Sequence, residues 1–516
     1  MNTSMAKKNR RSGGRSARKL MRASPLPDNM KPVGPGMIGG KYQPLSSDDV
    51  IAVEETIYQL LEEIGLSQAP PSGVEAMIKV GAILGEDNRL RFPRPLVKEM
   101  LSKSSRNITL FAQDPSYDLQ LNKNHVHYGT AGAAVNVVNV YDKTYRPSEA
   151  QDIYNAARIA ENLDNIHFFQ RPMVATDVVD PLDMDMNTLY ACISGTQKHV
   201  GVSFTEAQFV KPAMEILHEV SGGKNKWLER PFVSNSNCHV VPPMRFATES
   251  CLVMEEVIKS GMPVLLLSAG QAGATAPASI AGAVSQAVAE VIAGLIYVNS
   301  IIPGHPAICG TWPFVSDLRT GAMSGGSGEQ GLLTASCAQM LKHFDLPSGA
   351  AAGMADSKLP DAQSGYEKGS TAVMAGLAGL NLVYESVGMH ASLLGFCLES
   401  MIIDNDMLGQ CLRCVRGVEV NEKTLSLDTI RDVCLEGPGH YLGHKQTLTV
   451  METEYVYPSI SDRSSPKEWN ENGRPELLDT AHKEVNNILM NYKPTHIHST
   501  VDKTIRSKNN ILFKPS

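Results

Sequence analysis

The chain has 516 residues, of which 42% are hydrophobic and 20% are charged, and its formal net charge at pH 7 is −7. This composition is typical of a soluble globular protein, and the length allows two or three domains or one large barrel with extensions. The nine cysteines lack the spacing of a disulfide framework, which argues against a disulfide scaffold and predicts reduced thiols in a cytoplasmic protein.

The first 40 residues are predicted to form a disordered basic arm. Eight Lys or Arg residues and no acid occur up to Arg22, which leaves −15 of formal charge on the rest of the chain. Positive charge in a segment rich in Gly and Ser is typical of disorder. The arm lacks the apolar core of a signal peptide. Nucleic-acid or anionic-surface binding by the arm is the less favoured interpretation.

Residues 41–120 are predicted to form a helical N-terminal region, because helical patches alternate there with turns marked by proline. Between residues 121 and 405, short runs suited to buried strands recur eight times, each followed by a polar or glycine-rich loop and a helical pattern. The eight predicted strands are Val126–Tyr128, His167–Gln170, Val200–Phe204, Phe232–Ser234, Val264–Ser268, Ala307–Gly310, Gly349–Ala352 and Asn381–Glu385.

This repeated pattern of strand, loop and helix predicts an α/β protein built as a (β/α)8 TIM barrel with helical N-terminal and C-terminal extensions. Parallel strands need a crossover of at least a dozen residues, usually a helix, and eight such units close a barrel. No GxGxxG motif follows the first strand, so an open dinucleotide-binding sheet is disfavoured. Residues 406–516 are predicted to be mainly helical, and to pack on the barrel or make subunit contacts.

Two further segments have distinct predictions. Residues Ala134–Val140 predict a β-ribbon inserted in the first unit. The most apolar long segment is Ala276–Pro303, but it contains Ser285, Gln286 and Glu290. Those polar residues, with small residues at helical spacing, favour a buried helix over a membrane span. We therefore expect a soluble protein.

The carboxyl ends of the predicted strands are where a barrel of this kind builds its site. The residues there are polar, amide-rich and aromatic, and few of them are Cys or His. A catalytic zinc needs about three His, Cys or carboxylate ligands and an open position, so no metal site is predicted. The glycine-rich stretch Gly321–Gly328 lacks the GK[ST] ending of a phosphate-binding loop and predicts a flexible loop or lid.

Three residues at these ends invite both a structural and a functional interpretation. Trp312 is one of only three tryptophans; it is either a core aromatic or one face of a cage for a cation, because Trp offers the best face for cation–π attraction. Asp356 is either a helix cap or a member of the site. Glu385 ends an apolar strand, where an unpaired carboxylate is costly, so a cationic partner or ligand is expected.

Four segments carry a family resemblance. They are GMADSKLPDAQSGYEKG (Gly353–Gly369), LAGLNLVYESVGMHAS (Leu377–Ser392), EGPGHYLGHKQTL (Glu436–Leu448) and YVYPSISDRSSPKEWNENG (Tyr455–Gly473). Together with the Arg/Gly-rich N-terminal arm they resemble the trimethylamine methyltransferase family. The similarity covers nearly the whole chain, from about Gly40 to Tyr492.

The resemblance implies a (β/α)8 barrel that moves a methyl group from a methylated amine to the cobalt of a corrinoid carried by a small partner protein. The founding members carry pyrrolysine inside the barrel, whereas this sequence has only the twenty standard residues. It therefore resembles the non-pyrrolysine branch, for which quaternary amines such as glycine betaine are the known kind of substrate. The corrinoid is then the only cofactor, brought by its partner protein, and no tightly bound metal is expected.

The strand-end residues fit that chemistry. A quaternary ammonium leaves as a neutral amine, so no catalytic acid or base is assigned, and cobalt(I) is the nucleophile. The protein must hold the cation, aim one methyl group and exclude water. The residues predicted to bind the ammonium are Trp312, Phe314, Phe204, Asp356 and Glu385. Those predicted to bind a substrate carboxylate are Arg171, Lys358 and His390.

The leading hypothesis is thus a cytoplasmic corrinoid-dependent methylamine or betaine methyltransferase that works as a homo-oligomer, without membrane or nucleic-acid partners. The alternatives are a methyltransferase with a different donor or acceptor, and a barrel that binds a cationic osmolyte or a corrinoid protein without turnover. The absence of an evident acid–base pair permits the non-catalytic alternative.

Overall fold

The structure is a computed structural model that describes residues 30–515, so most of the predicted basic arm lies outside the described residues. The chain divides into two units. The larger one, the barrel unit, comprises Pro35–Val418 and Pro458–Ser516, and the smaller one contains Glu419–Tyr457. The barrel unit holds the predicted strands and the candidate site.

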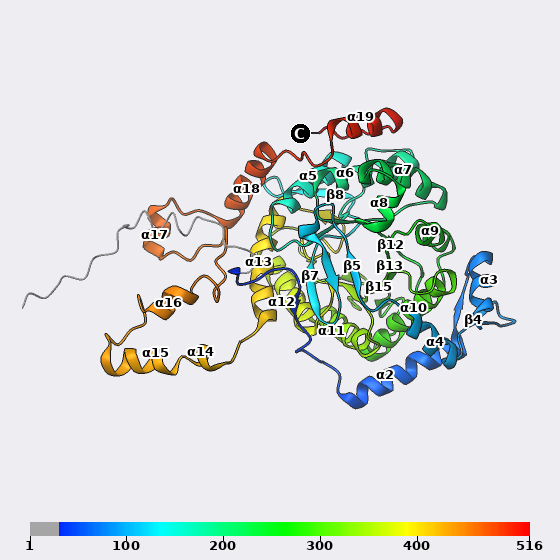
Figure 1. Cartoon of the computed structure of the whole chain (residues 1–516), viewed down its shortest axis with the longest axis horizontal. Helices are drawn as coiled ribbons and strands as arrows, with labels where there is room; N and C mark the ends of the chain where they lie inside the picture. Colours follow the sequence, from blue (N-terminus) through cyan, green and yellow to red (C-terminus); the bar gives the residue numbers. More distant parts are fainter. Residues whose placement is uncertain (1–29, 516) are drawn as a thin grey trace, which may run out of the picture. The chain divides into compact units, whose positions relative to one another are not determined.

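Eight parallel strands form the centre of the barrel unit, surrounded by helices (Figure 1). In chain order the strands are β7 (His125–Tyr128), β10 (Phe168–Gln170), β11 (His199–Val202), β12 (Val233–Asn237), β13 (Val264–Ser268), β15 (Ala307–Thr311), β18 (Ser348–Ala351) and β19 (Leu382–Tyr384). Each of the eight predicted strands overlaps one of them. The order in the sheet is β7-β19-β18-β15-β13-β12-β11-β10, and the short strand β1 (Met37–Ile38) runs antiparallel on the outer side of β7.

The two ends of this series meet at a narrow seam. Gly129 and Phe168 form one parallel bridge, and the backbone N–H of His167 donates to the carbonyl of Tyr128 at 2.7 Å. A side chain at Gly129 would place its Cβ 2.5 Å from the ring of Phe168, so the close approach requires glycine. The sheet is therefore an α/β barrel joined at its seam by a bridge rather than by a full ladder. The predicted barrel is confirmed to that extent.

Each barrel strand is followed by a helix, as the repeated pattern in the sequence predicts. They are α5 (Ala150–Glu161), α6 (Pro181–Gly195), α7 (Val210–Ser221) with α8 (Lys224–Glu229), α9 (Thr248–Lys259), α10 (Ile280–Ile301), α11 (Gly328–His343), α12 (Ala362–Ala378) and α13 (Leu398–Arg416). The last of these completes the eighth unit at Arg416, so the barrel extends beyond residue 405.

Helix α10 is buried, as its polar residues predicted. Of the described residues, it is the one helix with the length and hydropathy of a membrane span, and 83% of its most apolar 18-residue window is buried inside the protein. Its Glu290 accepts hydrogen bonds from the backbone of Met244 at 2.8 Å and from Ser268 Oγ at 2.5 Å. These contacts place α10 in the core of the barrel unit.

The region before the barrel contains both helices and short strands. Helices α2 (Ser47–Gln59), α3 (Pro71–Lys79) and α4 (Arg94–Lys103) are accompanied by a three-stranded sheet of β2 (Leu66–Ser67), β4 (Arg89–Arg91) and β3 (Ile83–Leu84). A hairpin of β5 (Ile108–Leu110) and β6 (Leu119–Leu121) follows. Its residue Phe111 accepts a hydrogen bond from His199 Nδ1 at 2.6 Å, so this hairpin covers the amino-terminal end of the barrel. The two- and three-residue strands are too short to leave an alternating pattern in the sequence.

The opposite, carboxyl-terminal end carries the predicted β-ribbon. Strand β8 (Asn136–Asn139) pairs antiparallel with β9 (Thr144–Pro147), and this hairpin joins β21 (Gly395–Phe396) and β20 (Met389–His390) in a four-stranded sheet. The ribbon prediction is confirmed. This sheet ties the loop after β7 to the loop after β19, which are neighbours in the barrel.

Three helices close the chain: α17 (Pro466–Glu471), α18 (Leu477–Asn491) and α19 (Ser499–Lys508). Helix α18 packs on α13 and α5, and Arg158 of α5 donates from Nη2 to the carbonyls of Leu489 and Tyr492 at 2.7 and 2.5 Å. This part of the chain packs on the barrel helices, one of the two roles predicted for the C-terminal region.

Candidate functional site

Glu385 is the most unusual group at the carboxyl end of the barrel. It directly follows β19 with a φ of +61°, which is uncommon for a residue with a side chain. Its side chain is fully buried, and neither carboxylate oxygen has a hydrogen-bond partner among the described residues. Burial raises the pKa of Glu385 to about 8. A buried carboxylate in this state is stabilised by a proton or by a cationic ligand.

Tyr384, the residue before Glu385, belongs to a cluster of three aromatic rings. The ring of Tyr384 lies 5.4 Å, centroid to centroid, from that of Trp312 and 4.9 Å from that of Phe168. A Cβ on Gly349 would approach the ring of Tyr384 to 2.9 Å, so this ring fills the barrel interior. The indole Nε1 of Trp312 is buried without a partner among the described residues. Phe168 lies in β10 and Tyr384 in β19, and Trp312 directly follows β15.

Two residues that follow other strands, Arg171 after β10 and Cys238 after β12, lie at the same end of the barrel. Strand β12 lies opposite β19, with three strands between them in each direction, and Cys238 directly follows β12. Burial raises the pKa of the Cys238 thiol, the charge of Arg171 lowers it, and that of Glu385 raises it further. The thiol is nevertheless in contact with solvent. Cys238, Arg171 and Glu385 therefore share the mouth of the barrel.

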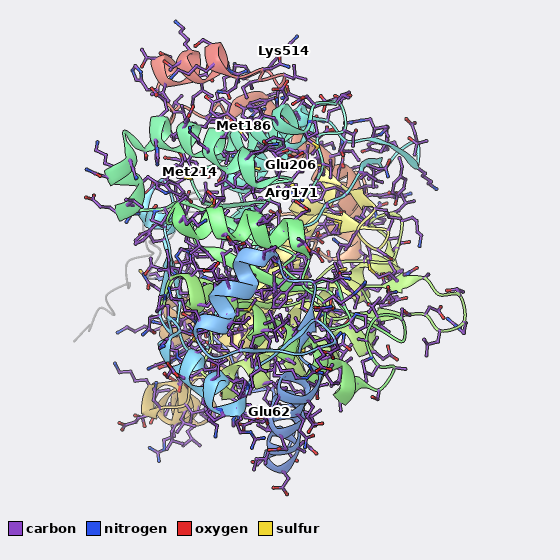
Figure 2. The ribbon with its side chains drawn as sticks, turned by 90° about the vertical axis from the view of Figure 1, so that its right-hand side faces the viewer. Glu62, Arg171, Met186, Glu206, Met214 and Lys514 are labelled. Carbon is purple, nitrogen blue, oxygen red and sulfur yellow. The ribbon has the colours of Figure 1, made fainter. Side chains whose placement is uncertain are left out.

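The side chain of Arg171 is only weakly fixed by hydrogen bonds within residues 30–515. Its Nη1 donates to the carbonyl of Gly132 at 3.5 Å, the one side-chain hydrogen bond that it makes within the described part of the chain. Burial lowers its pKa, and the nearby charge of Asp185 opposes that effect. Asp185 accepts hydrogen bonds from the N–H and the hydroxyl of Thr205 at 2.7 and 3.0 Å. Figure 2 shows Arg171 in the same part of the molecule as Glu206 and Met186. A guanidinium has five donors, so Arg171 retains capacity for an anionic ligand group.

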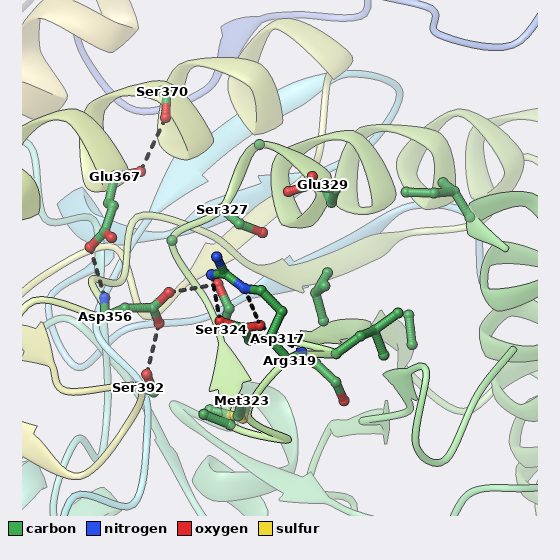
Figure 3. Close-up of a pocket in the computed structure, with 18 of the residues that line it drawn as sticks. Asp317, Arg319, Met323, Ser324, Ser327, Glu329, Asp356, Glu367, Ser370 and Ser392 are labelled. Atoms are coloured by element: carbon green, nitrogen blue, oxygen red, sulfur yellow. Dashed lines mark hydrogen bonds and ion pairs between the residues drawn. The ribbon is translucent and has the colours of Figure 1, made fainter. Parts of the chain in front are cut away.

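A separate cavity of about 820 Å³ opens beside the ends of β15 and β18 (Figure 3). Its walls come from the hairpin of β16 (Phe314–Ser316) and β17 (Met323–Ser324), the glycine-rich turn before α11, and the start of α12. Asp356 and Lys358 line it, whereas Glu385 and Trp312 do not. We regard the barrel mouth rather than this cavity as the candidate site, because the buried carboxylate of Glu385, which has no hydrogen-bond partner among the described residues, lies at the mouth.

The carboxylate of Asp356 is occupied by the protein itself. It accepts hydrogen bonds from Ser324 Oγ at 2.6 Å, from the backbone N–H of Gly325 at 2.8 Å and from Ser392 Oγ at 2.7 Å. Figure 3 shows Ser324 and Ser392 on either side of the carboxylate of Asp356. The backbone N–H of Asp356 also donates to Glu367 Oε2 at 2.8 Å. Asp356 therefore holds the glycine-rich stretch predicted to be a flexible loop; part of that stretch forms β17, and Ser327 caps α11.

The other predicted site residues lie in varied surroundings. Lys358 is exposed and donates from Nζ to the carbonyl of Asp356 at 2.7 Å. His390 is buried on β20, where its Nε2 lies 2.7 Å from Ser400 Oγ, and burial holds its pKa well below the ordinary value. Phe314 is buried in β16, and Phe204 is buried just after β11. Trp312, Glu385 and Arg171 thus each follow a barrel strand at its carboxyl end, whereas Asp356 and Lys358 line the separate cavity and His390 lies on β20.

Three residues of the mouth were missed from the sequence as site residues. Tyr384 and Phe168 read as ordinary strand residues, although the two-residue alternation along Leu382–Tyr384 could have identified the inward ring. Cys238 follows its strand without any sequence signal that marks it as a site residue. Within residues 30–515, no group of three or more His, Cys, Asp or Glu side chains is arranged to hold a metal ion.

The chain was compared with known proteins. A family model described as trimethylamine methyltransferase matches residues 11–509. A trimethylamine methyltransferase of Desulfitobacterium hafniense (strain DSM 10664 / DCB-2) is 27% identical over 465 residues, covering 90% of this chain and 92% of that protein. A glycine betaine methyltransferase of Desulfitobacterium hafniense (strain Y51) is 29% identical over 473 residues, covering 92% and 97%. The crystal structure of the Methanosarcina barkeri monomethylamine methyltransferase covers 88% of this chain and 96% of that one, at 13% identity and a TM-score of 0.46.

Proposed function

The chain belongs to the trimethylamine methyltransferase family, and from that premise we propose that it moves a methyl group from a quaternary or tertiary methylated amine to a corrinoid. The donor is of the glycine betaine type. The acceptor is the cobalt(I) of a corrinoid carried by a small partner protein. The matched relatives are methyltransferases that take a methyl group from trimethylamine or from glycine betaine, and both donors are methylated amines.

The observation that carries the proposal is the buried carboxylate of Glu385, which has no hydrogen-bond partner among the described residues and directly follows Tyr384, whose ring contacts that of Trp312. A quaternary ammonium has no N–H and forms no ordinary hydrogen bonds with a site. It is bound by an opposite charge and by aromatic faces, which attract cations through their quadrupole. A carboxylate that has no hydrogen-bond partner within residues 30–515, next in sequence to a member of an aromatic cluster, matches these requirements.

The proposed reaction does not require an acidic or basic catalytic residue. The carbon–nitrogen bond breaks, its electron pair stays on the departing neutral amine, and the methyl group passes to the cobalt(I) of the acceptor, which supplies the electron pair for the new bond. The protein's residues hold the ammonium, orient one methyl group toward the acceptor and keep water away. Because Glu385 attracts the cationic substrate more than the neutral product, its contribution is to substrate binding.

Arg171 is the residue that distinguishes a betaine from a simple amine. A betaine carries a carboxylate close to its ammonium, and a guanidinium binds a carboxylate with paired hydrogen bonds. The charges of Arg171 and Glu385 both act on the pKa of Cys238, and we propose that one zwitterion is bound by both residues. Trimethylamine would leave Arg171 without a ligand, which favours a betaine as the substrate.

The remaining predictions complete the proposal. We take residues 121–405 as a (β/α)8 barrel, preceded by the regions 1–40 and 41–120 and followed by the C-terminal region 406–516, whose first residues complete α13. Phe204, Phe314, Asp356, Lys358 and His390 remain predicted substrate contacts, of which Asp356 and Lys358 line the cavity beside the mouth. The enzyme is proposed to be cytoplasmic and homo-oligomeric, without a tightly bound metal of its own.

The test is methyl transfer by the purified protein. Glycine betaine, carnitine, choline and trimethylamine are each supplied with free cob(I)alamin or with a reduced small corrinoid protein, and methylcobalt formation is followed by absorbance. We expect methyl transfer from a betaine to at least one of the two acceptors. If no donor gives methylcobalt above the enzyme-free control with either acceptor, the proposal is wrong. Calorimetric binding of betaine without transfer would instead support the non-catalytic barrel.

A further inference from the structure

A buried ion pair holds the loop that follows β19. Oδ2 of Asp404, a residue of α13, accepts a hydrogen bond from the backbone N–H of Gly388 at 2.8 Å, three residues after Glu385. The same oxygen lies 2.8 Å from Nζ of Lys368, a residue of α12. The side chains of Lys368 and Asp404 are only 3% and 4% exposed. Two helices and the loop that carries Glu385 therefore meet at one carboxylate.

The turn Glu385–Gly388 is held at two points. Near its start, the backbone N–H of Ser386 donates to the carbonyl of Gly129, which follows the neighbouring strand β7, at 3.1 Å. At its end, the N–H of Gly388 donates to Asp404. The contacts of Ser386 and Gly388 together set the direction in which the chain leaves Glu385.

The backbone of Glu385 needs this support. Its φ of +61° lies in the left-handed region, which is unfavourable for a residue with a side chain. Its carboxylate has no hydrogen-bond partner among the described residues that would offset the strain. A strained conformation persists only when the surrounding structure over-determines it. The contact between Gly388 and Asp404 is part of that surrounding structure.

The stability of the fold does not by itself account for a pair buried this deeply. Taking two charges out of water is costly, and replacing a buried ion pair by well-packed apolar residues is often neutral or stabilising. Burial raises the pKa of Asp404, and the charge of Lys368 lowers it, so the ammonium favours the ionised carboxylate. Hydrogen bonds to an ionised acceptor are stronger than those between neutral groups. The pair is therefore suited to fixing the N–H of Gly388.

A second contact ties the same loop to the same face of α13. Nε2 of His390 lies 2.7 Å from Oγ of Ser400. Ser400 precedes Asp404 by four residues, so both side chains lie on one face of the helix. Burial and, second, the charge of Lys368 hold the pKa of His390 well below its ordinary value, so the imidazole is neutral. Of the two contacts, only the one at Asp404 involves a charged pair.

We propose that Lys368 and Asp404 are positioning residues, which hold the loop after β19 in the conformation that presents the Glu385 carboxylate to a cationic ligand. The cationic ligand comes from the proposed function, whereas the effect on Glu385 is independent of it. Without the pair, the turn relaxes and the carboxylate reaches water or a protein donor. The pKa of Glu385 then falls toward the ordinary value of about 4.3.

The experiment compares the ionisation of Glu385 in the full-length wild type and in a pair variant that carries Lys368→Met and Asp404→Leu. Removing both charges avoids leaving one of them buried alone. The thermal midpoint of each protein is measured from about pH 4 to pH 9, with and without Glu385→Gln. The difference that Glu385→Gln makes at each pH isolates Glu385, because the titration of other groups is common to both members of a comparison.

In the wild type this difference should level off near pH 8, where the buried carboxyl is ionised. In the pair variant we expect it to level off at least about one pH unit lower. A folded pair variant with an unchanged levelling-off pH would overturn the proposal and leave the pair a structural role alone.

The matched control is another aspartate that accepts from both a cation and a backbone N–H. Asp118, which precedes β6 at the amino-terminal end of the barrel, accepts from Arg230 Nη2 at 2.8 Å and from the N–H of Ala112 at 2.9 Å. Arg230→Met with Asp118→Leu should change the thermal midpoint without moving the levelling-off pH of Glu385. A shift as large as that of the pair variant would overturn the specific role of Lys368 and Asp404.

Two further measurements keep the outcomes separate. A wild type that binds no glycine betaine in calorimetry would contradict the proposed function, while the thermal comparison would still decide the positioning role. If the pair variant does not fold, hydrogen exchange of the wild type decides instead. The N–H of Gly388 should then be protected like that of Ser386, and exchange at the rate of an unstructured chain would overturn the proposal.

Discussion

The ring of Trp312 lies 5.4 Å from the ring of Tyr384, centroid to centroid, with an angle of 45° between their planes. The first residue follows β15 and the second ends β19, so the contact crosses the strand β18 that separates them in the sheet. The pair places an indole next to the residue that precedes Glu385. A cation bound beside this ring pair would contact aromatic faces close to the chain position of the Glu385 carboxylate.

Replacing Trp312 by leucine is expected to weaken the binding of the methylated amine. Cation–π attraction at a desolvated site contributes about 0.5–2 kcal/mol, or roughly 2- to 30-fold in affinity. Calorimetric titration with glycine betaine measures the change. Trp469→Leu is the matched control, because Trp469 is a partly exposed residue of α17. Equal affinity in the Trp312 variant and the wild type would remove the indole from the site.

Substrate affinity is expected to rise with pH up to about pH 8. The pKa of Glu385 is about 8 without a ligand, so the carboxyl must lose its proton before it pairs with a quaternary ammonium. The apparent affinity should therefore increase about tenfold per pH unit below that value and level off above it. Titrations in buffers of different ionisation enthalpy would detect the released proton. In Glu385→Gln the affinity should be low and independent of pH, and a persisting slope would assign the proton to another group.

The stability of the ligand-free protein is expected to fall between about pH 5 and pH 8. Burial raises the pKa of Glu385 in the folded state, whereas the unfolded chain ionises near the ordinary value of about 4.3. In that window the folded state binds more protons than the unfolded state, so rising pH favours unfolding. The Glu385→Gln variant should show a flatter dependence of the thermal midpoint on pH. Parallel curves for the two proteins would contradict this assignment.

Arg171→Gln is expected to change the choice of substrate. If the guanidinium binds the substrate carboxylate, its loss should raise the KM for glycine betaine by roughly 10- to 100-fold, since hydrogen bonds to charged groups contribute about 1.5–3 kcal/mol. Choline has the same ammonium but no carboxylate, so any turnover of choline should change little. A parallel loss with both compounds would indicate a structural role for Arg171.

Asp356→Asn is expected to loosen the wall of the cavity more than it weakens substrate binding. The carboxylate accepts hydrogen bonds from Ser324, Gly325 and Ser392, and an amide provides only one oxygen for them. Hydrogen exchange of the backbone around Gly325 should become faster. Asp317→Asn, a partly exposed position of the same cavity wall that is paired with Arg319, is the control. A loss of affinity as large as that of Glu385→Gln, with unchanged exchange, would make Asp356 a direct ligand contact.

The sequence by itself determined the eight strands, the buried helix α10 and the ribbon that begins at β8. Each of these depends on local information: buried runs of strand length, polar residues in an apolar helix, and an alternating pattern before a turn. It also placed Trp312, Glu385 and Arg171 at strand ends, because in a barrel the carboxyl ends of all strands lie on one face.

Only the tertiary structure decided what these side chains contact. Asp356 and Glu385 are both acids that follow an apolar strand, yet protein donors occupy the carboxylate of Asp356 while Glu385 has no partner among the described residues. The difference arises because Ser324 and Ser392 come from distant parts of the chain, whereas the positive φ of Glu385 sets the direction of its side chain. The ring contact of Tyr384 with Phe168 across the seam also depends on residues that are distant in the chain. Side-chain direction and non-local pairing depend on backbone angles and strand register, and those emerge only when the barrel is assembled.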